Sequence, residues 1–164
     1  MGAFEQAYIY AEEALQVPRE PFEAEHELLP HFYLLRGEAS HGLGDYEAAI
    51  ASKRKARQLW EAPVWPGYRS SCRVVSEQEP NVDCLSKVYL SLALSYRSLG
   101  NHRHALAYQQ RVVKLWTRWA PRHPSRKAWM AAAYRDMSVT YWQRRAYVDA
   151  LWYQLRAVYY LDLP

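Results

Sequence analysis

The sequence predicts an all-α protein, an α-α superhelix (solenoid) built from antiparallel helix pairs. A motif that combines a tight turn with a helix start recurs four times along the 164 residues. The segments on both sides of the motif space their apolar residues every three or four positions, as helices that bury one stripe do. Val74-Val75 is the only short run of β character, and it lies in a long insertion. These observations favour about seven helices in a right-handed superhelix, as three full repeats after a half repeat.

The motif is clearest in the stretch Gly44-Asp45-Tyr46-Glu47-Ala48-Ala49-Ile50. Gly44 can adopt the positive φ that ends a helix, and Asp45 is suited to cap the next helix. Tyr46 is large enough to bridge the two helices, and Ala49 is small enough to let them approach closely. The motif therefore predicts a helix pair with a tight connection.

The four copies begin at Gly2, Gly44, Gly100 and Arg145, which are 42, 56 and 45 residues apart. Prolines near residues 18–21, 63–66 and 121–124 separate the units. We expect a single domain over 1–164, with a half repeat at 1–20, full repeats at 21–62, 83–120 and 124–164, and an insertion loop at 61–82. Because Gly2 opens the chain at a turn position, the first helix lacks its pair-mate, and we expect the chain to belong to a larger protein or assembly.

Three helix starts can be predicted from local chemistry. Ser125 is a candidate N-cap for the third full repeat, and Asp83 for the second. Pro30 falls inside a helix expected to begin among residues 23–27. Either that helix kinks at Pro30, or it begins there with proline as its first residue.

The insertion accounts for the spacing of 56 residues. Its first half is rich in turn residues and aromatics, and we expect it to be ordered, with Trp65 packed on a neighbour. Its second half, 69–81, is polar and is expected to be mobile. Cys72 and Cys84 flank one loop, so a disulfide is sterically conceivable, but we expect free thiols in a reducing compartment.

The repeated positions resemble the tetratricopeptide repeat. Its first helix carries an aromatic residue, then a leucine, a small residue and a tyrosine, and a Gly-x-Tyr-x-x-Ala turn and an alanine on the second helix follow. The leucine position holds Arg36, Leu92 and Met137, so the first full repeat departs from the pattern. The spacing of 42 to 45 residues is similar to the longer-period repeats of kinesin light chains. The other matching residues are Tyr33, Tyr89 and Tyr134; Gly37, Ala93 and Ser138; Tyr96 and Tyr141; and Ala14, Ala56 and Ala157.

Charge is divided unevenly along the chain. Residues 1–30 carry seven acids and one base, whereas residues 31–164 carry 20 bases and 10 acids. Such a dipolar molecule could attract an acidic partner or associate end to end with itself. The chain has no signal peptide and no apolar run near 18 residues, so we expect an intracellular, cytoplasmic protein without membrane insertion.

Catalytic chemistry is not indicated by the sequence, and we expect no enzyme, metal site or cofactor. The histidines His31, His41, His102, His104 and His123 do not pair with carboxylates at metal-ligand spacing, and no phosphate-binding loop precedes a helix. The family resemblance implies instead a scaffold or adaptor that binds a protein or peptide segment.

The resemblance places the binding groove on the first helix of each pair. An apolar groove with cations along it would suit a segment with acidic and leucine-type residues. The carboxylate clamp of some chaperone-binding members is not expected, because Leu34 and Glu38 occupy two clamp positions and no asparagine lies at any of them. The candidate groove residues are Leu34, Glu38, His41, Lys87, Leu90, Leu94, Arg97, Arg135, Val139 and Trp142.

A second hypothesis is a nucleic-acid-associated repeat protein or ribonucleoprotein subunit. A basic cluster on the second helix of the first full repeat, together with bases near residues 118–127, could follow a phosphate backbone. Trp116, Trp119 and Trp129 could stack on bases. The candidate basic patch consists of Lys53, Arg54, Lys55, Arg57, Arg122, Arg126 and Lys127.

Overall fold

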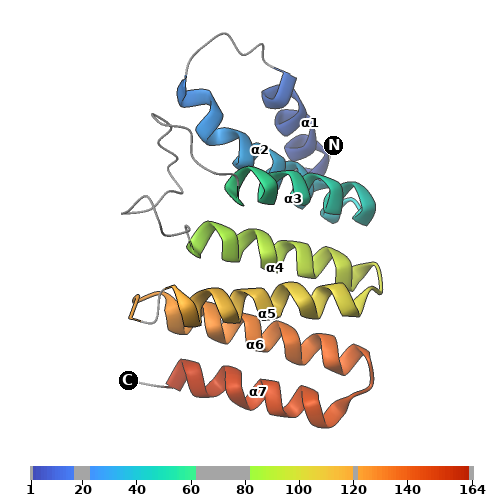
Figure 1. Ribbon diagram of the computed structural model, residues 1–164. Coiled ribbons are helices and arrows are strands. Elements are labelled where there is room, and N and C mark those ends of the chain that lie inside the picture. The colour runs from blue at the N-terminus through green and yellow to red at the C-terminus, as the bar shows by residue number, and fades with distance from the viewer. Residues whose placement is uncertain (1, 17–22, 62–81, 120–121, 163–164) are drawn as a thin grey trace.

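The computed structural model describes residues 2–16, 23–61, 82–119 and 122–162, and within them it contains seven α-helices and no strand (Figure 1). This confirms the predicted all-α solenoid. The helices are α1 (Ala3–Gln16), α2 (Glu23–Gly42), α3 (Tyr46–Glu61), α4 (Val82–Ser98), α5 (His102–Arg118), α6 (Arg126–Gln143) and α7 (Tyr147–Asp162).

The helix pairs form two layers. The helices α2, α4 and α6 begin their pairs and are called A helices; α1, α3, α5 and α7 are B helices. The backbone of α4 contacts both α2 and α6, whereas no contact joins α3 to α5 or α5 to α7 within the described residues. Because the A helices lie closer together than the B helices, the A layer forms the inner side of the curve. Figure 1 shows the helices stacked in chain order from α1 to α7.

The turns have the predicted chemistry. Gly44 and Gly100 have φ values of 84° and 78°, in the left-handed region that favours glycine. The Asp45 Oδ1 atom accepts a hydrogen bond from the Ala48 N–H at 2.9 Å, and Asn101 caps α5 by accepting from the His104 N–H at 3.3 Å. These contacts confirm that the motif ends one helix and starts the next.

One of the predicted helix starts needs correction. α4 begins at Val82, so Asp83 lies in its first turn and is not the N-cap. Its carboxylate instead accepts a hydrogen bond from Trp129 Nε1 on α6 at 2.6 Å. Ser125 does occupy the N-cap position of α6 but makes no side-chain capping bond. Pro30 lies inside α2, which excludes the alternative in which the helix starts there.

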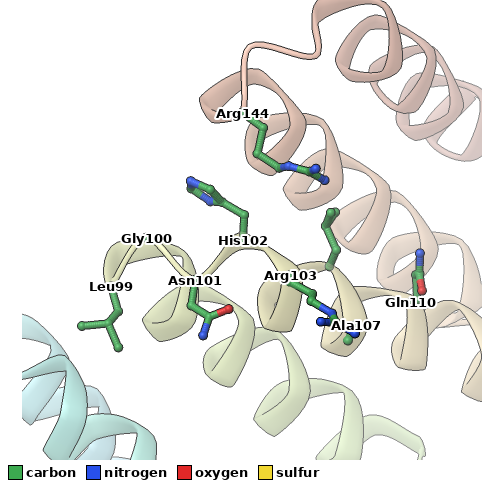
Figure 2. Close-up of a pocket in the computed structure, with 9 residues that line it drawn as sticks. Leu99, Gly100, Asn101, His102, Arg103, Ala107, Gln110 and Arg144 are labelled. Atoms are coloured by element: carbon green, nitrogen blue, oxygen red, sulfur yellow. The ribbon is translucent and has the colours of Figure 1, made fainter.

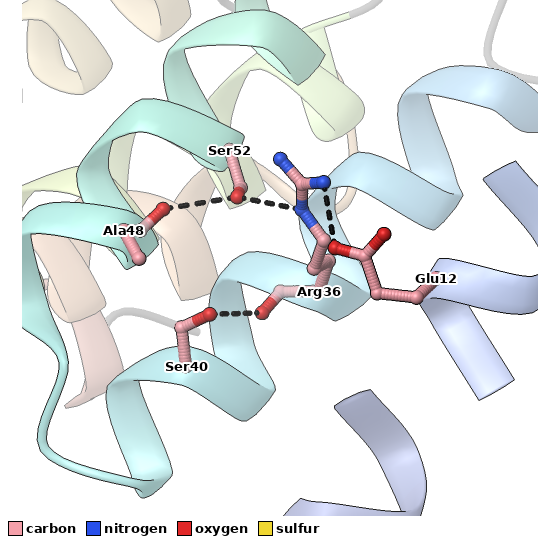
Figure 3. Close-up of polar contacts among 5 residues, drawn as sticks. All are labelled: Glu12, Arg36, Ser40, Ala48 and Ser52. Atoms are coloured by element: carbon pink, nitrogen blue, oxygen red, sulfur yellow. Dashed lines mark hydrogen bonds and ion pairs between the residues drawn. The ribbon is translucent and has the colours of Figure 1, made fainter. Parts of the chain in front are cut away.

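The half repeat is attached by a polar link that explains the departure at Arg36. The guanidinium donates from Nη1 to Glu12 Oε1 on α1 and from Nε to Ser52 Oγ on α3, both at 2.9 Å (Figure 3). Ser52 Oγ in turn donates to the Ala48 carbonyl oxygen at 2.9 Å. Arginine therefore replaces leucine where a side chain must join three helices.

The predicted insertion lies largely outside the described residues, as do Trp65, Val74-Val75 and Cys72. α3 ends at Glu61 and α4 begins at Val82, at the limits predicted for the loop. Cys84 is disulfide-bonded, so the prediction of a free thiol is wrong for that residue.

Arg145 takes the place of glycine in the last turn, with a φ of 62°. A residue with a side chain in this left-handed region is destabilised by about 1–2 kcal/mol. Replacing it with glycine removes this strain but increases the entropy of the unfolded chain, which cancels only part of the gain in stability. We expect Arg145→Gly to raise the free energy of unfolding by about 0.5–1 kcal/mol in urea denaturation. The matched control is Arg144→Gly, at φ −80°, which should not stabilise. Equal effects of the two substitutions would contradict this explanation.

Candidate partner-binding surface

The exposed apolar side chains of the A layer lie in register. Counting back from each turn residue, the sixth positions are Glu38, Leu94 and Val139, and the third are His41, Arg97 and Trp142. Because α4 contacts both other A helices, equivalent positions form rows across the layer. Leu94, Val139 and Trp142 are 38%, 40% and 63% exposed. The inner groove is defined here by Leu35, Glu38, His41, Lys87, Leu90, Leu94, Arg97, Arg135, Val139 and Trp142.

One predicted groove residue is wrong. Leu34 is only 2% exposed and belongs to the hydrophobic core, whereas its neighbour Leu35 is 50% exposed. Successive helical residues point about 100° apart, so a shift of one position moves a side chain from the surface to the core. The sequence could not separate them, because two adjacent leucines fit either rotation of α2.

The charges of the inner groove are partly neutralised. Lys87 and Arg135 are exposed, while Arg97 is half-buried and donates from Nη1 to the Asp136 carbonyl oxygen at 3.4 Å. Burial raises the pKa of the Asp136 carboxyl, and Arg97 and Arg135 oppose that rise. The exposed cations of the inner groove are thus Lys87 on α4 and Arg135 on α6.

Lys53 does not belong to a solvent-facing basic patch, and that prediction is wrong. Its side chain is 1% exposed, and Nζ donates to Ser95 Oγ at 2.8 Å and to the Ser91 carbonyl oxygen at 3.2 Å. Burial lowers the pKa of the Lys53 amine to about 8, although Glu38 acts in the opposite direction. Gly37 makes room for this chain, since a Cβ there would lie 2.6 Å from Lys53 Cγ. The signal in the sequence was its spacing, because Lys53 lies on the stripe of Ala49 and Ala56.

The same polar contact reaches the floor of the inner groove. His41 Nδ1 lies 3.2 Å from Ser95 Oγ, so one hydroxyl joins α2, α3 and α4. Burial lowers the pKa of the His41 imidazole, and the nearby cations Lys53 and Arg97 lower it further. The Ser95 hydroxyl thus connects the His41 imidazole at the floor of the groove to the buried Lys53 amine.

The other residues of the predicted basic patch are dispersed. Arg54 donates to the Tyr96 hydroxyl, and Arg57 donates to the Tyr108 hydroxyl at 2.8 Å and pairs with Glu61 at 3.3 Å. Lys55 is exposed on α3, whereas the remaining three lie just before or at the start of α6, where Arg122 and Lys127 are exposed and Arg126 is half-buried.

The tryptophans predicted to stack on bases are largely occupied within the protein. Trp116 is fully buried and stacks on Trp129 at 6.3 Å between ring centroids. Trp119 is 37% exposed, with the Arg118 guanidinium 4.9 Å from its ring centroid. A stacking platform is therefore not available at Trp116, and the nucleic-acid hypothesis loses that support.

A shallow hollow lies away from the inner groove. It has a volume of about 900 Å³ and lies between the start of α5 and the end of α6, where Figure 2 shows Arg144 near His102 and Gln110. Its lining is mainly polar and belongs to the turn regions and the outer side of α5.

The described residues contain no group of three or more His, Cys, Asp or Glu side chains that could hold a metal ion. None of their helices is long and apolar enough to cross a membrane.

The fold and the inner groove define a helical-repeat protein of the solenoid class. The tetratricopeptide repeat family model matches residues 30–57 and 86–115, which lie in the α2–α3 and α4–α5 pairs. The α2–α3 and α4–α5 pairs are therefore each similar to a tetratricopeptide repeat. The further likeness to the longer repeats of kinesin light chains is not tested by this match and stays a prediction.

Solved structures share the fold. The crystal structure of MamA aligns with a TM-score of 0.55 and 15% identity, over 98% of this chain and 79% of that one. The crystal structure of BtubC (BKLC) from P. vanneervenii aligns with a TM-score of 0.65 and 16% identity, over 99% of this chain and 58% of that one. This chain thus spans little more than half of the BtubC chain. No curated protein sequence matches it. Proteins of this repeat family are typically non-catalytic scaffolds for protein–protein interaction.

The buried amine allows a test of the electrostatics beneath the groove. The pKa of Lys53 is lowered from 10.5 to about 8 on folding, so between these values the unfolded chain binds more protons. Stability should therefore rise with pH through this window. Relative to Lys53→Met, we expect the wild-type free energy of unfolding to increase by about 2 kcal/mol between about pH 7.5 and 9.5. Urea denaturation at several pH values measures this difference, and a difference independent of pH would contradict the buried-amine interpretation.

Proposed function

We propose that the chain is a protein-interaction adaptor whose inner groove binds an acidic, leucine-rich segment of a partner protein. The observation that carries this proposal is the pair of exposed apolar side chains at equivalent positions of adjacent A helices, Leu94 and Val139, with the exposed Trp142 three residues further along α6. Isolated exposed leucines are ordinary on protein surfaces, but apolar side chains aligned across helices favour a partner surface.

The arrangement favours a helical or extended segment over a small molecule. The inner groove is a surface rather than a closed cavity, and Leu35 on α2 extends its apolar character beyond α4 and α6. A partner segment with apolar residues at helical or alternating spacing could contact several A helices at once. Trp142 is the expected anchor, because large aromatics contribute most to such interfaces.

The cations set the preferred charge of the segment. Lys87 and Arg135 are exposed on α4 and α6, the helices that carry Leu94 and Val139, and the half-buried Arg97 lies in the last turn of α4. Complementary acidic residues would raise the association rate and select against basic segments. Membership of a larger assembly, an intracellular location and self-association belong to this proposal as expectations drawn from the sequence.

A charge-swap experiment tests the groove. Two synthetic helical peptides would be compared by fluorescence anisotropy, both with leucines at every third or fourth position, one with glutamates and the other with lysines between them. We expect the acidic peptide to bind at least tenfold more tightly to the wild type. The double variant Lys87→Glu/Arg135→Glu should reverse that preference, because both side chains are exposed at the groove edge.

The matched control is Lys55→Glu/Lys114→Glu, which reverses two exposed charges on the B helices. It should leave the preference of the wild type unchanged. Equal binding of the two peptides, or the same preference in both double variants, would overturn the proposal.

A further inference from the structure

One side of α7 is exposed, although the equivalent side of α3 and α5 packs against the next A helix. Four positions follow each turn residue by 6, 9, 13 and 16 residues and form one stripe along the B helix. We call the four on α7 the terminal stripe: Leu151, Gln154, Val158 and Leu161. Leu151, Val158 and Leu161 are 62%, 42% and 67% exposed.

The equivalent stripes on α3 and α5 are largely covered by the next A helix. At the first position Ile50 and Leu106 are each 7% exposed, and at the second Lys53 and Gln109 are 1% and 0% exposed. At the fourth, Trp116 is fully buried and stacks on a tryptophan of α6. The same positions are therefore interfaces in two repeats and open surface in the third.

A polar contact repeats at the centre of these interfaces. Lys53 donates to Ser95 Oγ on α4 at 2.8 Å, and Gln109 Nε2 donates to Thr140 Oγ1 on α6 at 3.0 Å. In both cases the donor lies nine residues after a turn residue, and the hydroxyl lies five residues before the next one. Gln154 is the third copy of the donor, and it is exposed.

We infer that the terminal stripe binds one A-type helix of a partner. Such a helix is amphipathic and presents a small residue two positions before a serine or threonine, as in Ala93-x-Ser95 and Ser138-x-Thr140. The stripe continues the series of α3–α4 and α5–α6 interfaces, so the same chemistry specifies its occupant. The amide of Gln154 would donate to the partner's hydroxyl, and Leu151 would be buried beside it.

A second copy of this chain does not supply the occupant. Each A helix is already packed between two B helices of its own chain, α2 between α1 and α3, α4 between α3 and α5, and α6 between α5 and α7. In each described A helix, the sides that pack on B helices are therefore already covered.

A neighbouring row on α7 extends the apolar surface. It comprises Val148, Trp152, Leu155 and Tyr159, which are between 48% and 85% exposed. The equivalent residues of α5 are Arg103, Ala107, Gln110 and Lys114, which suit contact with water. The row that is largely polar on α5 is thus apolar on α7. This is expected if the partner of α7 covers this row as well as the terminal stripe.

The probe for this surface is a labelled peptide of residues 126–143, the A-type sequence that packs on α5 within the protein. We expect it to bind the whole chain in fluorescence anisotropy, and Leu151→Glu to weaken binding at least tenfold, because the interface would bury a charge. Leu151 is exposed, so this substitution leaves the fold intact. The control Leu43→Glu, at a similarly exposed leucine in the α2–α3 turn, should change affinity less than twofold.

The polar contact has its own test. A peptide with Thr140→Val should bind the wild type several-fold more weakly, since it leaves the Gln154 amide unpaired. Gln154→Leu in the protein should restore its affinity, because both partners are then apolar.

Leu94→Glu separates this surface from the proposed groove, since it alters only the latter. Peptide binding lost in Leu94→Glu but kept in Leu151→Glu would place the peptide in the groove and overturn the inference. The inference also fails if the peptide does not bind the wild type. It fails too if sedimentation shows a dimer that Leu151→Glu dissociates, because the occupant would then be a second copy.

Discussion

The contact between each B helix and the A helix of the next repeat is the interaction on which the structure depends. Helices in a solenoid touch only their neighbours, so no distant part of the chain can replace this contact. It buries Ile50 and Leu106, and at its centre a side chain of the B helix donates to a hydroxyl of the A helix. The A helices are drawn together by these contacts while the B helices diverge, and this produces the inner groove.

The same constraint relates the two proposed binding surfaces. The inner groove arises because A helices align, so its apolar rows are a consequence of the repeat. The terminal stripe arises because α7 has the residues of an interface but no described helix against it. A contiguous group of exposed apolar side chains is uncommon on a surface that only contacts water. The same side chains are expected at an interface of the kind by which α3 and α5 are covered by the next A helix.

The repeat could be predicted because its residues act locally. Gly44, Gly100 and Asp45 shape turns through their own backbone and side-chain chemistry, so the sequence predicted the helix pairs and their limits. The positions of single side chains depend on helix rotation and on neighbours distant in sequence. For this reason the sequence does not distinguish the buried Leu34 from the exposed Leu35. Lys53 was predicted to lie on the surface, but its buried amine donates hydrogen bonds to the Ser91 carbonyl oxygen and to Ser95 Oγ on α4. The exposure of α7 could not be predicted either. Its sequence is as apolar as that of a buried helix, so only the packing shows that these side chains are exposed.

Native-state hydrogen exchange tests the dependence on the B-to-A contact most directly. The α4–α5 pair is covered on both sides, by α3 and α6, whereas among the described helices α7 packs only on α6. The amides of α6 and α7 should therefore exchange through a partial opening of lower free energy than the opening that exposes α4 and α5. Equal protection of all four helices, lost in a single global step, would contradict this account.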